Sequence, residues 1–379
     1  PDTARLRAYL RRYPLHLPAD TVPICLLEDH DGNAWLGTAG QGLWRHSGRF
    51  AQLVPMPANY ATTGVTLAAP PAGTMPTVWG TAGIQFFTLN SPLAANTDAH
   101  SPLPGPVRAL LPRPAALGGG TWQGVAHGGV WHAARPGTPA TRVPGLPTDL
   151  DVAALAYSPT SGLWVGTVAD GIYYLPLAGT ALPAVHFTTA NGLLHNQIYA
   201  LLADHTGRVW VATHGTGLAV WQPRSRQFTY YRLNPSGLAA NALAEDAEGT
   251  IWVGTEGQGL YYCPAGEARW HPLEAVSGGL PDDNISAIVP VGLRLLLVHP
   301  QALALLDAHQ RTVQPIRLLA RNFLPAAAVS AGPRPTAWVA TQAGLLSLDW
   351  AALLTWTTQV AAAPSLALTG AEVDGESRP

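Results

Sequence analysis

A tryptophan motif that recurs along the whole chain constrains its fold more than any other feature of the sequence. The fullest copies have the form D-x-x-G-x-x-W-x-x-T and lie at residues 29–38, 204–213 and 246–255. Five weaker copies place Val78, Trp122, Trp164, Leu295 and Trp338 at the tryptophan position. The eight positions are 42–46 residues apart, and a fixed period of this length is typical of repeat architectures. We number the units one to eight in chain order.

Each unit carries the signals for four short strands. In unit five, apolar and aromatic runs predict strands at residues 197–202, 208–213, 218–221 and 227–231. The Asp204–Gly207 cluster predicts a hairpin turn between the first two strands, and a glycine-rich turn follows the second. Four strands in a unit of this length are the blade of a β-propeller. One such unit cannot bury both of its faces, so neighbouring units must stack and the ring must close.

We therefore predict an all-β protein, a β-propeller of four-stranded antiparallel blades over residues 1–360, with eight blades preferred to seven. Residues 6–13 have the pattern of a lone fourth strand and are expected to complete the last blade, which supplies only three strands. In the alternative with seven blades, one degenerate unit stays outside the ring. Residues 364–375 alternate apolar and polar side chains, so residues 361–379 are expected to begin a further, truncated part or a tail.

Composition excludes several classes of protein. Charged residues make up only 12% of the chain, too few for a disordered chain or for long surface helices. The net charge is −2 and the basic residues are scattered, so no stripe exists that could bind nucleic acid. The longest uncharged stretches, 51–97 and 351–371, are interrupted by proline or polar residues and predict no membrane span. Cys25 and Cys263 lie in apolar runs and are expected to be buried free thiols rather than a disulfide, and no metal-ligand spacing surrounds them.

The repeated motif, together with linkers of the form G-L-x-x-N, resembles the two-component regulator propeller repeat. The linkers lie at residues 192–196, 237–241 and, one residue longer, 279–284. In that family such propellers form the extracytoplasmic sensor region of bacterial hybrid two-component receptors and often sense glycan fragments. A small β-sandwich, a membrane span and a histidine kinase follow them, and residues 364–375 resemble the beginning of that sandwich.

The resemblance implies a periplasmic or extracytoplasmic location and a small polar ligand such as an oligosaccharide. It also implies a homodimer formed through a downstream region that this chain is expected to lack. Any kinase activity would lie outside the chain, so we expect no enzyme activity, no cofactor, no nucleic acid and no membrane contact by this segment itself.

Blade topology predicts where the ligand binds. The Asp…Gly turns all lie on one face, which we call the Asp-turn face. The glycine-rich turns and the linkers lie on the opposite face, which we call the Gly-turn face. Donors and acceptors around a central funnel suit a hydroxyl-rich ligand, although any one of these side chains could instead cap a turn. The predicted ligand-binding residues are Gln41, His127, Asp170, His195, Asn196, His214, Asn241, Glu256, Gln258 and Asn284.

The other prominent residues have structural interpretations. The repeated tryptophan is expected to pack between blades, and Asp29, Asp204 and Asp246 are expected to cap hairpins rather than to bind calcium. His127 and His214 occupy equivalent turns two units apart, which leaves a metal or general-base role open, but no metal site and no catalytic residue is predicted. We rank the functions as a ligand-binding sensor first, a protein-interaction scaffold second, and a propeller lyase, lactonase or hydrolase third.

Overall fold

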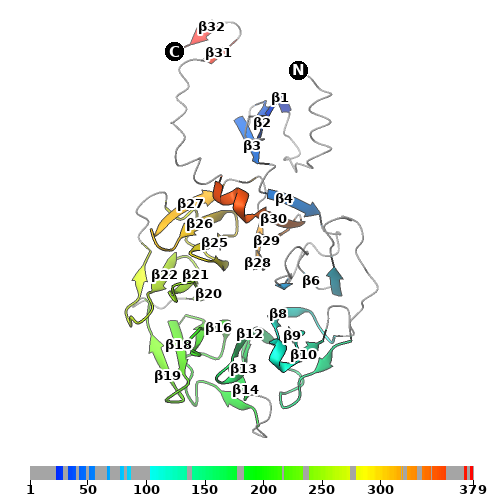
Figure 1. The fold of residues 1–379 in the computed structure, drawn as a ribbon, viewed down its shortest axis with the longest axis vertical. Helices are drawn as coiled ribbons and strands as arrows, with labels where there is room; N and C mark the ends of the chain where they lie inside the picture. Colours follow the sequence, from blue (N-terminus) through cyan, green and yellow to red (C-terminus); the bar gives the residue numbers. More distant parts are fainter. Residues whose placement is uncertain are drawn as a thin grey trace.

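Antiparallel sheets account for almost all of the regular structure. The structure is a computed structural model, and it describes residues 23–28, 33–39, 42–47, 51–55, 66–68, 77–80, 83–86, 103–134, 139–176, 183–215, 217–233, 239–273, 279–316, 318, 322–330, 335–342, 344–355, 371–373 and 376–378. Six four-stranded sheets, two three-stranded sheets and one two-stranded sheet are formed by these residues. The predicted all-β propeller with four-stranded antiparallel blades is confirmed (Figure 1).

Units two to four form the first three sheets of the ring, each with its strands in chain order. Unit two contains β5 (Thr66–Ala68), β6 (Thr77–Gly80) and β7 (Gly83–Phe86). Unit three contains β8 (Val107–Pro112), β9 (Thr121–Val125), β10 (Gly129–Ala133) and β11 (Thr141–Arg142), with a 3-10 turn, η2 (Ala115–Leu117), between β8 and β9. Unit four contains β12 (Val152–Ser158), β13 (Gly162–Thr167), β14 (Ile172–Pro176) and β15 (Val185–Phe187).

Units five to seven form the next three sheets in the same way. Unit five contains β16 (Ile198–Ala203), β17 (Val209–Thr213), β18 (Gly217–Gln222) and β19 (Gln227–Tyr231), each within a residue or two of its predicted bounds. Unit six contains β20 (Ala240–Glu245), β21 (Ile251–Thr255), β22 (Leu260–Cys263) and β23 (His271–Pro272). Unit seven contains β24 (Ala287–Val291), β25 (Arg294–Val298), β26 (Leu303–Asp307) and β27 (Thr312–Ile316).

The last sheet joins the two ends of the ring. Unit eight supplies β28 (Phe323–Val329), β29 (Thr336–Thr341) and β30 (Gly344–Asp349), and residues 350–355 continue as a short helix. The fourth strand is β4 (Ala51–Pro55), which pairs antiparallel with β30 from Ala51↔Leu348 to Pro55↔Gly344. The prediction that residues 6–13 would complete this blade is therefore wrong about the strand, since β4 occupies that position; residues 6–13 themselves lie outside the described part.

The ring contains seven sheets, which corrects the preferred count of eight. Its inner strands β5, β8, β12, β16, β20, β24 and β28 are neighbours in that order, and β28 lies beside β5. Unit one lies apart from the ring as a sheet of β1 (Pro23–Glu28), β2 (Asn33–Thr38) and β3 (Gly42–Ser47) (Figure 1). The physical reason is that β4 hydrogen-bonds to β30 instead of β3, so unit one keeps only three strands. The unit left outside is thus one with a full motif, not a degenerate one.

The second strand of each blade lies at the centre of the packing between sheets. All described residues of β13, β17 and β21 are buried, and Trp164, Trp210, Trp252 and Trp338 are at most 2% exposed. The repeated tryptophan is therefore a core residue, as predicted. Burial of each such large apolar side chain contributes about 1.5–3 kcal/mol to the free energy of unfolding.

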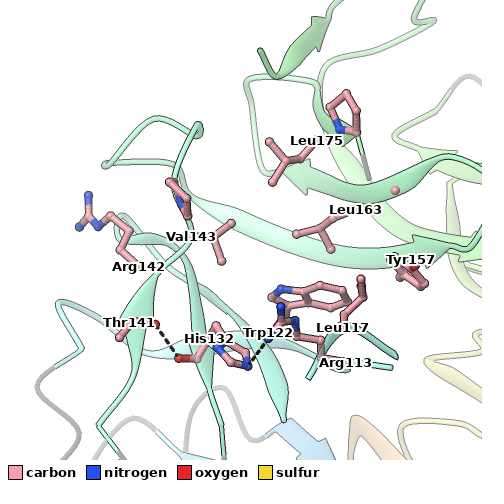
Figure 2. A pocket seen from close by; sticks show the side chains of 13 residues that line it. Arg113, Leu117, Trp122, His132, Thr141, Arg142, Val143, Tyr157, Leu163 and Leu175 are labelled. Carbon is pink, nitrogen blue, oxygen red and sulfur yellow. Dashed lines mark hydrogen bonds between the residues drawn. The ribbon is translucent and has the colours of Figure 1, made fainter. Parts of the chain in front are cut away.

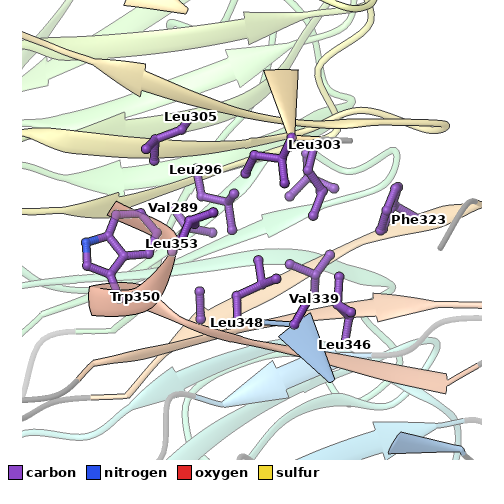
Figure 3. Close-up of a cluster of buried hydrophobic side chains, with 14 residues drawn as sticks. Val289, Leu296, Leu303, Leu305, Phe323, Val339, Leu346, Leu348, Trp350 and Leu353 are labelled. Atoms are coloured by element: carbon purple, nitrogen blue, oxygen red, sulfur yellow. The ribbon is translucent and has the colours of Figure 1, made fainter. Parts of the chain in front are cut away.

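The contact between units seven and eight illustrates how neighbouring blades are held together (Figure 3). Leu296 and Leu303 of unit seven pack against Val339 and Leu346 of unit eight, and all four are at most 3% exposed. The closing strand adds Ala51 to the same cluster, and the short helix adds Trp350 and Leu353. Apolar burial and strand pairing therefore both tie residues 51–55 to the last blade.

Two further predictions have mixed outcomes. Both cysteines are free, but only Cys263 is buried; Cys25 is exposed because β1 lies outside the ring. Of residues 364–375, the structure describes Ala371–Val373 as β31, which forms a hairpin with β32 (Glu376–Arg378). The domain boundary at residue 360 stays a prediction. Among the residues that the structure describes, no helix combines the length and the apolar character needed to cross a bilayer.

Candidate functional site

The Gly-turn face carries the predicted ligand-binding residues in three kinds of position. His127, Asp170, His214, Glu256 and Gln258 lie in turns between the second and third strands of their blades. His195, Asn196 and Asn284 lie in links between blades, whereas Asn241 is the second residue of the inner strand β20. Gln41 lies outside the described residues, so its position stays untested.

A β-bulge recurs near the start of the inner strand in units three to six, next to the Gly-turn face. The strand register shifts between Val107 and Ala109, Val152 and Ala154, Ile198 and Ala200, and Ala240 and Ala242. The extra residues are Arg108, Ala153, Tyr199 and Asn241. A bulge leaves its extra residue unpaired in the ladder and changes the direction of its side chain, and bulges are frequent beside functional sites. Four consecutive units therefore place one released side chain each at the same end of the inner strands.

In unit five, the bulge residue joins two of the predicted histidines. The ring centroid of His214 lies 5.6 Å from that of His195 and 5.8 Å from that of Tyr199, with the Tyr199 ring edge-on. The imidazole Nδ1 of His195 accepts a hydrogen bond from the backbone N–H of Gln197 at 3.0 Å. This hydrogen bond holds the His195 ring in place and leaves Nε2 as the second ring nitrogen. His214 is exposed to solvent. The group offers aromatic faces and ring nitrogens to one ligand.

In unit three, the bulge residue belongs to a charged group that contains His127. Arg108 Nη1 donates to Asp151 Oδ1 at 3.0 Å, and His127 Nε2 lies 3.7 Å from Asp151 Oδ2. Asp151 is the linker residue before β12, and its side chain is only 21% exposed between the two bases. We call Arg108, His127, Asp151, His195, Tyr199, His214 and Asn241 the Gly-turn rim. His127 and His214 thus belong to separate groups, each with its own partners.

Asp170 lies in a third group, farther along its blade. Its Oδ2 accepts a hydrogen bond from the Tyr173 hydroxyl at 2.7 Å, and its backbone carbonyl contacts His186 Nε2 at 2.7 Å. The rings of Tyr173 and His186 stack with centroids 4.1 Å apart. Burial and the hydrogen bond to Asp170 raise the pKa of Tyr173 well above its usual range.

Two of the predicted asparagines serve the links between blades. Asn196 Oδ1 accepts a hydrogen bond from the backbone N–H of Thr189 at 2.8 Å, which closes its linker. The carbonyl of Asn284 contacts Nδ1 of the fully buried His299 at 3.0 Å. Burial lowers the pKa of His299, so a neutral ring with Nδ1–H donating to Asn284 fits this contact. The side-chain contact of Asn196 directly supports the turn-capping interpretation, whereas Asn284 holds its link through the backbone carbonyl.

The remaining predicted residues lie in one turn of unit six. Glu256 and Gln258 are both exposed, and their backbone N–H groups donate to the Ala239 carbonyl and the Thr255 hydroxyl at 3.0 and 3.1 Å. Their backbones hold the turn in place. Their side chains extend the polar surface of the Gly-turn face by one blade beyond the bulge residue Asn241.

Three rim residues were not predicted, namely Arg108, Asp151 and Tyr199. A signal for two of them exists, because the sequence reads VRAL at 107–110, VAAL at 152–155, IYAL at 198–201 and ANAL at 240–243. The variable second position of this short motif is the bulge residue in every case. Asp151 has no such signal, since its role follows only from its contacts with Arg108 and His127.

Two cavities lie on the opposite, Asp-turn face. One of about 370 Å³ lies between units three and four, and another of about 370 Å³ lies beside Arg208 and Arg224 in unit five. Within the described part of the chain, no group of three or more His, Cys, Asp or Glu side chains is arranged to hold a metal ion.

The chain is similar in sequence to one protein family. The family model of the two component regulator propeller matches residues 16–40, 192–215 and 235–257. These segments contain the motif copies of units one, five and six, and the latter two include G-L-x-x-N linkers. No curated protein sequence matches the chain.

Solved structures share the fold at low sequence identity. One, described as the extracellular domain of the hybrid two component system BT3049 from B. thetaiotaomicron, is 19% identical with a TM-score of 0.67, covering 94% of this chain and 50% of that one. The extracellular domain of BT4673 from the same organism is 20% identical with a TM-score of 0.51, covering 88% and 39%. Streptogramin B lyase is 14% identical with a TM-score of 0.56, covering 79% and 97%. The chain thus spans half or less of the length of the two extracellular domains.

Proposed function

We propose that this chain, whose units one, five and six match the model of the two component regulator propeller, is the ligand-binding sensor propeller of a bacterial two-component signalling receptor. Its ligand would be a small polar molecule, with a glycan fragment as the first candidate. The structural neighbours described as extracellular domains support a location outside the cytoplasm. Any kinase would belong to other parts of the receptor.

The observation that carries this proposal is the Gly-turn rim. Arg108 and Asp151 offer a charged donor and acceptor, while His195, Tyr199 and His214 offer ring faces together with polar atoms. Asn241, with one amide donor group and one acceptor, comes from the next inner strand. A ligand with several hydroxyl groups can satisfy such a set through hydrogen bonds, and its ring can stack on an aromatic face.

Signalling would follow from the origin of the rim residues. They come from units three, five and six and from the links between blades, so one ligand would connect several sheets. Ligand binding favours the packing of the blades that brings these groups closest together. A ligand shifts the equilibrium between two conformations according to the difference between its affinities for them. A downstream region or a dimer partner would then detect the shifted packing.

The experiment that tests this proposal is a thermal-shift screen of the chain with monosaccharides and oligosaccharides, followed by calorimetric titration of any hit. A ligand at a hundredfold excess over its Kd raises the free energy of unfolding by about 2.7 kcal/mol. We expect His214→Ala to raise the Kd by about tenfold. The matched control is His309→Ala, since His309 is an exposed turn histidine on the Asp-turn face and should leave the Kd unchanged.

Equal affinity of wild-type protein and the His214→Ala variant would place the sugar site elsewhere and contradict the proposed rim. Turnover of the hit would favour the enzyme alternative, in which the similarity of fold to streptogramin B lyase would matter. That alternative has less support from the geometry, because His127 and His214 have separate partners.

A further inference from the structure

The turn between the first two strands of unit three reverses the charge found at the same place in unit five. Trp122 of β9 pairs with Leu111, as Trp210 of β17 pairs with Leu202. Two residues after these leucines stand Arg113 in unit three and Asp204 in unit five. The backbone N–H of each closes its turn at 2.9 Å, Arg113 on the Gly120 carbonyl and Asp204 on the Arg208 carbonyl. Arg113 therefore occupies the aspartate position of the repeat.

In unit five, the aspartate fills this position with a carboxylate. Asp204 Oδ2 accepts hydrogen bonds from Trp210 Nε1 at 2.8 Å and from Arg208 Nε at 2.6 Å, and the Asp204 side chain is fully buried. Unit six repeats the indole contact, with Trp252 Nε1 donating to Asp246 Oδ2 at 2.8 Å. Units five and six thus place a carboxylate at the indole N–H of the motif tryptophan. In unit four, Trp164 Nε1 donates instead to Ser161 Oγ at 2.9 Å, and in unit eight Trp338 Nε1 has no partner among the described residues.

Unit three lacks this built-in carboxylate. Among the described residues, the Trp122 indole N–H has no hydrogen-bond acceptor and Arg113 contacts no carboxylate. The Arg113 guanidinium lies over the Trp122 ring at 5.9 Å, as Arg208 lies over Trp210 at 5.1 Å. An indole N–H and a guanidinium are both hydrogen-bond donors, and the described lining of the cavity that both residues border contains no acidic side chain.

His132 lies between Arg113 and the rebuilt turn. Its Nε2 lies 3.1 Å from Arg113 Nη1 and 3.1 Å from the Gly119 carbonyl. One ring nitrogen cannot accept from Arg113 and donate to Gly119 at the same time. Because a guanidinium carries five N–H groups, Arg113 keeps N–H groups for a ligand whichever of the two contacts His132 makes.

A cavity opens at this position because the turn is rebuilt. The unit-three turn runs from Arg113 to Gly120 and includes η2, whereas the unit-five turn needs only Asp204–Arg208. The cavity of about 370 Å³ lies between Arg113 and Trp122 on one side and Leu163 and Leu175 of unit four on the other (Figure 2). Its described lining includes Arg113, Arg142 and His132 but no acidic residue.

We propose that this cavity binds a small organic carboxylate, whose carboxylate group takes the place that Asp204 and Asp246 occupy in their own units. The carboxylate accepts hydrogen bonds from Trp122 Nε1 and Arg113, and Leu163 and Leu175 cover the apolar part of the molecule. A volume of this size suits a ligand of one ring, since pockets for small molecules begin at about 300 Å³. This site is on the face opposite the Gly-turn rim and does not depend on it.

The test follows the indole N–H signal of Trp122 in a 1H–15N spectrum of the whole chain, identified by its loss in Trp122→Phe. Benzoate is the probe, and benzamide is the matched control with the same ring and no charge. We expect the Trp122 signal to shift and saturate with benzoate only. Arg113→Gln should weaken benzoate binding at least about tenfold, because a charge-assisted hydrogen bond is lost. Arg224→Gln, a change beside the other cavity of the same face, should leave binding unchanged.

A second variant distinguishes loss of the binding site from unfolding of the protein. Arg113→Asp installs the residue that unit five has at this position. It should shift the Trp122 indole signal, leave the indole signals of the other tryptophans in place, and abolish the response to benzoate. The proposal is overturned if benzamide shifts the Trp122 signal as benzoate does, if benzoate leaves it unmoved, or if Arg113→Gln binds as tightly as wild type. Should both Arg113 variants unfold, the comparison of benzoate with benzamide on wild-type protein decides the question.

Discussion

Units three and five are built on the same strand pattern, yet one encloses an anion of its own and the other has an open, cationic cavity. In unit five, Asp204 accepts hydrogen bonds from Thr206, Arg208 and Trp210 and is completely buried. In unit three, Arg113 takes that position, and a longer turn leaves space beside Trp122. The comparison teaches that one turn of the repeat can serve stability or binding, depending on whether the acceptor is part of the chain.

The largest expected difference concerns the motif tryptophans themselves. Trp210→Ala should lower the free energy of unfolding by about 3–5 kcal/mol, because it empties a buried volume and removes a donor to Asp204. Trp122→Ala should cost about 1 kcal/mol less, since this side chain already borders a cavity and donates to no described acceptor. Guanidinium unfolding of both variants measures the difference. An equal or larger loss for Trp122→Ala would contradict the open character of unit three.

A smaller effect is expected at the position where the charge is reversed. Asp204→Asn should cost about 2 kcal/mol, because an amide N–H₂ would face the donors of Trp210 and Arg208. Arg113→Gln should change the free energy of unfolding by no more than about 0.5 kcal/mol. The same unfolding measurement compares the two variants, and a costly Arg113→Gln would mean that the arginine is a structural element of its turn.

The aspartate also predicts a pH dependence. Burial alone would raise the pKa of Asp204, but hydrogen bonds from Thr206, Trp210 and Arg208 outweigh it and lower the pKa below its usual value. The ionised carboxylate therefore contributes stability above the ordinary aspartate pKa, and this contribution is lost as the pH falls through the lowered value. The stability gap between wild type and Asp204→Asn should accordingly narrow in acid.

The smallest effect concerns a contact that unit five makes with unit six. The exposed His205 ring is hydrogen-bonded to Glu245, which raises the pKa of His205. The pair stabilises the folded protein at pH values below the ordinary histidine pKa, and this stabilisation disappears as the pH rises through the raised pKa of His205. Glu245→Gln should return the pKa of His205 to its ordinary range in an NMR titration, with little change in stability because solvent screens the pair. An unchanged His205 pKa would show that Glu245 does not hold this turn.

Much of the blade could be predicted from local sequence. The four strands of unit five, the motif tryptophans and the capping roles of Asp204 and Asp246 each have a signal in a short stretch of sequence. Side-chain period, turn chemistry and burial are local properties, so the sequence expresses them directly. The sequence also predicts which turns lie on which face of the ring, because successive antiparallel strands run in alternating directions.

The candidate sites were predictable only in part. Histidines 127, 195 and 214 were correctly assigned to the Gly-turn face, but Asn196 and Asn284 serve the linkers. The partners Arg108, Asp151 and Tyr199 come from a bulge and a link whose contacts depend on how neighbouring sheets meet. Arg113 was missed because the turn of unit three is longer than that of unit five. The strand pairing of Leu111 with Trp122 is needed to show that Arg113 and Asp204 occupy the same position.

Eight similar units, each with antiparallel strands around a core residue and the pattern of a propeller blade, can be recognised in the amino-acid sequence alone. That seven sheets close the ring depends on tertiary contacts, because β4 pairs with β30 rather than with β3. A strand edge offers the same backbone hydrogen bonds to any partner strand. Its choice therefore depends on the packing of side chains far apart in the sequence, here Ala51 against the core between units seven and eight.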